Sequence, residues 1–417
     1  MEIIAGGPPA NDESQSNTTP FTIGYPIIVL FAVLDSAVPF IYWQNASFLN
    51  AWYSLTIAVK FLVCILVINK IHLGTVSFYS FYILMAMILI SSAVGGSEPF
   101  DYVRILSFVI SLFMTLSILT RQNLPIYMLT CVYTIGVSTL LYVFLAQTGH
   151  IDEDWGRFDY FGGNQPNLGT EIISISVIYA SCVMPPVRLI AFSVPSIYAI
   201  NLMQGRAGLI VSILAIAISL YTRIKSTVNR SMVGVVAIGV LIASLTIYNE
   251  ETLAYFNSIL LLDDEHRGVD TGYVGRGDLW EGAWRAFLQS PIVGNGAGFE
   301  ERLGVNPHNY FLYGLALFGM LSIFIFGVIF YLFYELYRTN IRWFLIVIVI
   351  SIMLVFNDRF FNLNPYPFLL YVILFAHSQD IVSPTITGPK HWAKILELYR
   401  QQPATRLPYS LMSRANR

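Results

Sequence analysis

The sequence has few charged residues for its length. Asp, Glu, Lys and Arg make up only 12% of its 417 residues, whereas hydrophobic residues make up 56%. An ordinary soluble domain is about 25% charged, and the mean hydropathy here is +0.64. The net charge of −2 offers no basic surface for a nucleic acid. The composition therefore argues against a soluble protein and a nucleic-acid partner, and favours the lipid bilayer.

Cysteine is scarce as well. Cys64, Cys131 and Cys182 lie far apart within apolar runs, so neither a disulfide framework nor a zinc site is expected. We expect these thiols to pack as small hydrophobic groups. The segment "GNGAG" at 294–298 lacks the preceding strand and the lysine of a nucleotide-binding loop. "DDEH" at 263–266 could bind a divalent ion but is more typical of a solvated loop. We predict neither a cofactor nor a metal.

Long apolar runs dominate the rest of the chain. Most have roughly twenty residues, the length that crosses a hydrocarbon core about 30 Å thick. Because lipid offers no hydrogen bonds to the backbone, these runs should be helices. The sequence predicts an all-α, polytopic membrane protein with about twelve transmembrane helices. They are expected near residues 23–43, 48–68, 74–95, 102–120, 124–146, 168–185, 188–203, 207–222, 232–248, 308–334, 342–357 and 363–378.

The polar segments predict how the chain is oriented. Residues 1–20 lack the basic segment of a signal peptide and are expected to be a disordered cytoplasmic tail. Residues 21–378 form the transmembrane domain, and residues 379–417 form a basic, amphipathic cytoplasmic tail. Lys and Arg in the short loops of one side place both ends inside. The long polar stretch 249–307 is then the large periplasmic loop.

The segments assigned to the outer side contain arginine but no lysine. Lysine would serve equally well for solubility, whereas the planar guanidinium grips phosphate or carboxylate through two hydrogen bonds and keeps its charge. An anion site and local pairing with Asp or Glu explain this set equally well. Its members are Arg104, Arg157, Arg206, Arg267, Arg276, Arg285, Arg302 and Arg359.

The end of the periplasmic loop carries a histidine at the membrane boundary. "GDLWEGAWRAFLQ" predicts an amphipathic helix, and "SPIVGNGAG" predicts a turn that ends it. Asn306 and Pro307 are expected to be the N-cap and first-turn pair of the next membrane helix. His308 would then lie in its first turn, where the helix dipole disfavours an imidazolium. A neutral His308 could accept a proton from a hydroxyl; a capping or interface role is the alternative.

Five other residues are candidates for chemistry near this boundary or inside the membrane. Arg276 precedes the amphipathic helix and Arg206 opens a membrane helix, and helix N-termini also attract anions. Asn309 could orient the imidazole or a sugar, or it could simply begin the helix. Asp35 and Lys60 are charges within predicted spans, which makes them functional candidates by default, and they could pair with each other.

Several of these motifs together resemble the O-antigen polymerase/ligase superfamily. The pattern is an Arg before a Trp-containing helix, a P-x-x-G-x-G turn, and His-Asn at the start of a Gly-rich membrane helix. It reads here as "GRGDLWEGAW…SPIVGNGAGFE…PHNYFLYGLALFGMLS". Upstream, "GGNQPNLGTEI" and "QGRAGLIVSILAI" are similar to earlier blocks of the family, so the resemblance covers residues 155–335.

The resemblance implies a metal-independent glycosyltransferase with a GT-C-like fold in the bacterial inner membrane. Its substrate would be an undecaprenyl-pyrophosphate-linked glycan at the periplasmic face. Arg206 and Arg276 would hold the donor pyrophosphate, and His308 would activate the acceptor hydroxyl. Further substrate-binding candidates are Arg157, Trp280, Arg285, Asn309 and Arg359.

The identity of the acceptor separates two enzyme functions. A polymerase transfers glycan to another lipid-linked repeat unit, with a chain-length regulator as possible partner, and a ligase transfers it to the sugar core of lipid A. The short outer loop has no strongly basic groove for a phosphorylated core, which favours the polymerase. A transporter of lipid-linked sugars would carry charges along mid-membrane helices and show repeat symmetry. A peptidoglycan glycosyltransferase of the cell-shape family would depend on an Asp.

Overall fold

The computed structural model describes residues 24–37, 46–71, 73–95, 97, 99–151, 153–154, 157–158, 166–224, 276–304, 309–351 and 365–378. Within these ranges the regular structure is helical apart from one short antiparallel pair of strands, in which Asp154 lies opposite Arg157. The all-α class is therefore confirmed. Both predicted tails, the predicted span 232–248 and most of the loop 249–307 lie outside the described residues.

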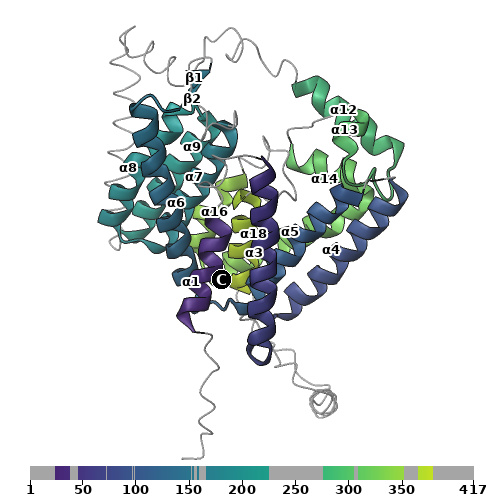
Figure 1. Cartoon of the computed structure of the whole chain (residues 1–417), viewed down its shortest axis with the longest axis horizontal. Helices are drawn as coiled ribbons and strands as arrows, with labels where there is room; N and C mark the ends of the chain where they lie inside the picture. Colours follow the sequence, from purple (N-terminus) through teal and green to yellow (C-terminus); the bar gives the residue numbers. More distant parts are fainter. Residues whose placement is uncertain are drawn as a thin grey trace, which may run out of the picture. The chain divides into compact units, whose positions relative to one another are not determined.

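The chain forms two compact units, each assembled from separate stretches of sequence. The first comprises Met1–Ile71, Pro125–Gly272 and Leu363–Phe368, and the second comprises His72–Leu124, Tyr273–Asn362 and Leu369–Arg417. Elements of the first unit are α1 (Tyr25–Ser36), α3 (Ala46–Leu66), η1 (Ile68–Lys70), α6 (Leu124–Gln147), β1 (Glu153–Asp154), β2 (Arg157–Phe158), α7 (Pro166–Val183), α8 (Pro186–Leu202) and α9 (Arg206–Arg223). Figure 1 shows α6 to α9 in teal.

The second unit contains the helices that follow the loop. They are preceded in sequence by α4 and α5, which pack against each other (Figure 1). Its elements are α4 (Thr75–Val94), α5 (Pro99–Ile118), α12 (Arg276–Gln289), α13 (Phe299–Leu303), α14 (Tyr310–Phe318), η2 (Gly319–Leu321), α15 (Ser322–Thr339) and α16 (Ile341–Ile348), with most of α18 (Pro365–Ser378).

The helices coincide with the predicted apolar runs. For α4, α6 and α9 the observed ends differ from the predicted ranges by no more than one residue. Among the described residues, four helical segments are long and apolar enough to cross a membrane, namely α4, α6, α9 and the continuous segment Tyr310–Thr339, and several shorter helices are also apolar. These helices are those of a membrane protein.

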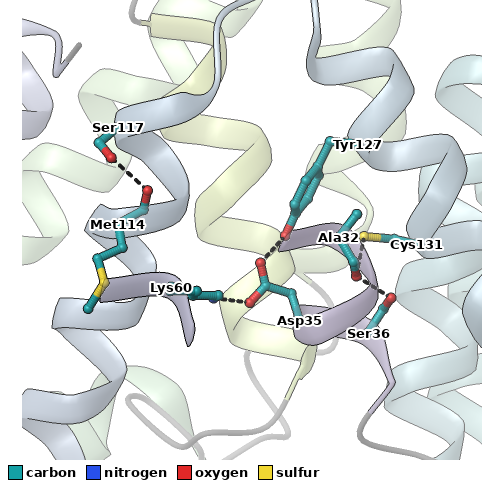
Figure 2. A network of polar contacts seen from close by, with 8 residues as sticks. All are labelled: Ala32, Asp35, Ser36, Lys60, Met114, Ser117, Tyr127 and Cys131. Atoms are coloured by element: carbon teal, nitrogen blue, oxygen red, sulfur yellow. Dashed lines mark hydrogen bonds and ion pairs between the residues drawn. The ribbon is translucent and has the colours of Figure 1, made fainter. Parts of the chain in front are cut away.

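A buried ion pair joins three helices of the first unit. Lys60 of α3 donates to one carboxylate oxygen of Asp35 in α1, and the Tyr127 hydroxyl of α6 donates to the other at 2.8 Å. Figure 2 shows both side chains pointing at the Asp35 carboxylate. The Lys60 ammonium also lies 4.8 Å from the centroid of the Phe368 ring. The side chains of Lys60 and Asp35 are 0% and 3% exposed, so the pairing considered from the sequence is confirmed.

The same helices show how the chain uses its cysteines. The Cys131 thiol lies 3.7 Å from the Ala32 carbonyl oxygen, which also accepts from the Ser36 hydroxyl within α1 (Figure 2). Cys64 and Cys182 are likewise buried, and none of the three cysteines forms a disulfide. The expectation that the cysteines serve packing is therefore confirmed.

We expect Asp35→Asn and Lys60→Met each to lower the free energy of unfolding by about 3–5 kcal/mol, because either change leaves a buried charge without its partner. The double variant should be more stable than either single variant, since it buries no unpaired charge. Thermal unfolding of the detergent-solubilised protein measures both effects.

A matched control is Arg285→Gln. It removes an exposed pair with Glu281 and should cost less than about 1 kcal/mol. Strictly additive losses in the Asp35 and Lys60 double variant would contradict the coupling of the two charges.

Candidate functional site

Helix α12 is the amphipathic helix predicted in the periplasmic loop, and Arg276 is its first residue. Ala283 and Ala286 are buried, with exposures of 0% and 2%, whereas Trp284 is 46% exposed. The helix packs against α14. Because the buried positions are alanines, the two helices can approach closely, and the helix that begins at Arg276 is held beside the helix that follows the His-Asn pair.

A turn at residues 290–298, which we term the clamp turn, fastens α12 to the far end of α14. The backbone N–H of Asn295 donates to the Ala316 carbonyl at 2.9 Å, and that of Gly296 donates to the Leu317 carbonyl at 3.1 Å. α14 ends at Phe318, and carbonyls in the last turn of a helix lack partners within it. The clamp turn therefore completes the hydrogen bonds of a helix to which it is not adjacent in sequence.

Glycine is required where the clamp turn meets its neighbours. Gly294 has φ +74°, and a Cβ there would lie 2.2 Å from the Leu317 carbonyl oxygen. A Cβ on Gly95, the C-cap of α4, would lie 2.1 Å from the Asn295 carbonyl oxygen. Both contacts are with backbone, which cannot swing aside. Gly294 of the "GNGAG" segment thus serves close backbone packing, and this is its physical role in the P-x-x-G-x-G pattern here.

Two arginines of the outer set have local partners. The guanidinium of Arg302 in α13 donates to the carbonyls of Ala297 and Asn295, and so braces the clamp turn. Arg285 pairs with Glu281 one turn earlier in α12 at 2.5 Å, and its side chain is 70% exposed. Pairing with a local Asp or Glu, the alternative explanation for the outer arginines, is therefore the observed state of Arg285, whereas Arg302 binds backbone carbonyls.

The start of α14 differs from the prediction. Asn309 is the N-cap, with an extended backbone (φ −152°, ψ 118°), and its side-chain oxygen accepts from the backbone N–H groups of Phe311 at 3.0 Å and Leu312 at 3.1 Å. The prediction that Asn306 and Pro307 begin this helix, with His308 in its first turn, is therefore wrong. Among the two readings of Asn309, the helix-start role is confirmed.

Burial explains why the helix begins where it does. Tyr310, the first residue of α14, is 2% exposed, and its hydroxyl is hydrogen-bonded to that of Tyr371 in α18. Asn306 and Asn309 are both suitable N-cap residues, so local preference does not choose between them. The packing of Tyr310 against α18 makes the choice.

Arg206 is the first residue of α9, as predicted, and is half-buried in the first unit. Its N-cap Gly205 has no room for a side chain, because a Cβ would lie 2.1 Å from Cγ2 of Thr170 in α7. Gly208, one turn later, is equally confined, and the Ser174 hydroxyl donates to its carbonyl at 3.2 Å. The blocks "NLGTEI" and "QGRAG" therefore meet, and small residues let these helices touch, as is usual in membranes.

The remaining candidates are distributed over both units. Trp280 is half-buried in α12, and Arg157 lies in strand β2 of the first unit. His308 and Arg359 lie outside the described residues. The structure thus brings together the helices that begin at Arg276 and after Asn309, within the second unit.

Sequence reasoning missed Asn295 and Arg302 as structural residues of this site. An Asn between two glycines, in a turn that follows an amphipathic helix, is the feature that could have indicated the first. Both side chains donate to backbone carbonyls. Every residue has such a carbonyl, so the sequence does not indicate which ones will accept these hydrogen bonds.

One comparison with known proteins gave a match. A protein-family model described as O-antigen ligase matches residues 191–326. The matched segment contains α9, α12, the clamp turn and α14. The match confirms the resemblance to the O-antigen polymerase/ligase superfamily and indicates a membrane enzyme of the glycosyltransferase/ligase type. Neither the curated proteins nor the solved structures gave a match.

We expect Gly294→Ala to destabilise the second unit far more than Gly304→Ala. Both residues have positive φ, +74° and +63°, but only Gly294 faces backbone, whereas a Cβ at Gly304 would meet open space. An alanine in the left-handed backbone conformation costs about 1–2 kcal/mol of stability, and this cost is common to both variants. The difference between their unfolding temperatures in detergent therefore isolates the clash with Leu317. Equal losses would contradict the close packing.

We expect Asn309→Ala to cost about 1 kcal/mol of stability, because the N-cap hydrogen bonds of α14 are lost. Asn309→Asp and Asn309→Ser keep an oxygen in place and should restore most of that loss. Thermal unfolding of the three variants measures the effect. If the Asp and Ser variants were as unstable as the Ala variant, capping would not be what Asn309 contributes.

Proposed function

We propose that this chain is a polymerase of bacterial surface polysaccharide. It transfers glycan from an undecaprenyl-pyrophosphate-linked donor to a hydroxyl of a lipid-linked acceptor glycan, without a metal. Arg276 and Arg206 bind the donor pyrophosphate and His308 is the general base. The observation that carries this proposal is the clamped contact between α12, which begins at Arg276, and α14, whose N-cap Asn309 follows His308 in sequence. Both helices lie in the segment matched by the family model.

The reaction requires one base and a stabilised leaving group. The acceptor hydroxyl oxygen attacks the anomeric carbon of the donor sugar, and its proton passes to the neutral imidazole of His308. The bond from that carbon to the pyrophosphate oxygen breaks, and undecaprenyl pyrophosphate leaves with the electron pair. Fixed guanidinium groups stabilise the negative charge that develops on the pyrophosphate. Attack opposite the leaving group inverts the anomeric configuration.

The other candidate residues have supporting roles in this proposal. Trp280, Arg157 and Arg359 are substrate-binding candidates. Arg285 would have to exchange Glu281 for the donor, because the two now form a pair. The side-chain oxygen of Asn309 caps α14, so a contact with substrate would use its amide nitrogen.

The arrangement in the membrane completes the proposal. We place the chain in the bacterial inner membrane with about twelve spans, a GT-C-like fold and both ends in the cytoplasm. The loop 249–307 and the site then face the periplasm, where donor and acceptor lipids share the outer leaflet. The protein partner consistent with this reaction is a chain-length regulator.

A ligase is the second candidate, since the matched family model is described as O-antigen ligase. The chemistry at the donor is the same, and only the acceptor differs. A strain lacking a polymerase displays a single repeat unit on its surface. A strain lacking a ligase accumulates lipid-linked polymer and displays bare lipid A core.

We expect His308→Ala and Arg276→Ala each to lower product formation by at least about 100-fold, the size typical of losing a general base or a charge-stabilising donor. Arg276→Lys should restore activity only in part, because an ammonium cannot form the two-pronged contact. The measurement is the surface glycan profile of a deletion strain that expresses each variant at equal membrane abundance.

The matched control is Arg188→Gln. Arg188 is exposed in α8, and its variant should make normal polymer. Wild-type yield from both the His308 and the Arg276 variants would overturn the proposed chemistry.

A further inference from the structure

We propose that Asn295 is a positioning residue for glycosyl transfer. Its side chain ties the end of α12 to the end of α14, and so limits how the start of α12, at Arg276, can move relative to the Asn309 cap of α14. The link to the reaction rests on the proposed function, whereas the tie between the helices stands on the structure alone.

The Asn295 amide bridges the two helices directly. Its Nδ2 donates to the Ala286 carbonyl in the last turn of α12 at 2.7 Å and to the Ala316 carbonyl near the end of α14 at 2.9 Å. Its backbone N–H donates to the same Ala316 carbonyl at 2.9 Å. A neutral amide nitrogen carries two hydrogens, so one side chain serves both helices at once.

Both accepting carbonyls have lost their usual helical donors. In a continuing α-helix the Ala286 carbonyl would accept from Ser290, but the Ser290 N–H donates to Phe287 at 3.1 Å. The Ala316 carbonyl would accept from Met320, whose N–H is diverted out of the helix.

The diverted Met320 N–H donates to the Pro291 carbonyl at 2.7 Å. The clamp turn and the end of α14 have therefore exchanged hydrogen bonds. Asn295 supplies the donors that make this exchange complete. A residue without an amide would leave the Ala286 carbonyl without this donor and the Ala316 carbonyl with the backbone N–H of residue 295 alone.

The tie reaches the backbone of Arg276 and the Asn309 cap through the helices themselves. α12 has 14 residues and α14 has 9, and short helices behave as stiff rods. With their ends joined and the two helices packed against each other, the start of α12 has little freedom to move relative to the Asn309 cap. A displacement of about 1 Å in a catalytic group can cost about 100-fold in rate. Loss of the Asn295 bridge should therefore lower the turnover rate.

The direct test measures the relation between the two helix starts. Spin labels are attached at Gly277→Cys, where a side chain meets open space, and at Phe311→Cys, where the native side chain is 37% exposed. The native cysteines are buried. Electron paramagnetic resonance then gives the distance distribution in the full-length protein. We expect a narrow distribution with Asn295 and a broad one in Asn295→Ala and Asn295→Asp, whose carboxylate would face two carbonyls.

Ser290→Ala is the matched control. It removes the hydrogen bond from the Ser290 hydroxyl to the Gly294 carbonyl, 2.7 Å long and internal to the clamp turn, and leaves the bridge between the helices intact. Its distance distribution and turnover should remain those of the wild type.

Turnover is measured on protein that carries no spin label. The rate is divided by the amount of folded protein, taken from the monodisperse peak in size-exclusion chromatography. The probe is lipid-linked glycan extracted from a strain that lacks this chain. We expect turnover of Asn295→Ala to fall 10- to 100-fold at temperatures well below its unfolding transition. A narrow distribution with wild-type turnover in Asn295→Ala would overturn the proposal and leave Asn295 a stabilising residue only. A broad distribution with unchanged turnover would overturn it as well.

Failure of the proposed function looks different. If Asn295→Ala broadens the distribution and lowers turnover while His308→Ala retains activity, Asn295 positions the site but the assignment of the general base is wrong.

Discussion

A backbone polar group buried among apolar side chains must find a hydrogen-bond partner, and the end of α14 is where this constraint has most effect. The apolar run that includes this helix continues well past it in the sequence, yet the α-helix stops at Phe318 and Gly319 takes φ +60°. Each unpaired group in an apolar medium costs several kcal/mol. The clamp turn supplies the donors, and the segment that follows α12 is thereby fixed to the apolar helix α14.

Burial also decides what the charged residues do. Lys60 and Asp35 lie in the interior of the first unit, where each charge requires the other. Arg285 and Glu281 form a pair with the same chemistry on an exposed helix face, and such a pair contributes little. The Arg302 guanidinium donates hydrogen bonds to two backbone carbonyls. Not every arginine of the outer set is therefore available to the donor pyrophosphate of the proposed function.

The parts of the site that follow from local chemistry were predictable. Gly205 before Arg206 and the glycines around Arg276 mark helix starts, and both helices begin at these arginines. The turn after α12 was also predictable, because glycine and proline interrupt the periodic pattern. The start of α14 was not. Two asparagines three residues apart compete as caps, and the decision lies with Tyr310 and its partner in α18, which is distant in sequence.

By itself the sequence determined the class of the protein, the positions of its helices and the residues suited to the proposed chemistry. These properties depend on hydropathy, helix length and residue type, all of which are local. Only the tertiary structure decided that Asn295 joins the C-terminal ends of α12 and α14. It also decided that Asp35 and Lys60 form a pair and that Arg302 stabilises the clamp turn. Each of these contacts depends on a backbone carbonyl or a charge that folding brings close. Because all backbone carbonyls are alike, the sequence does not show which one a side chain will bind.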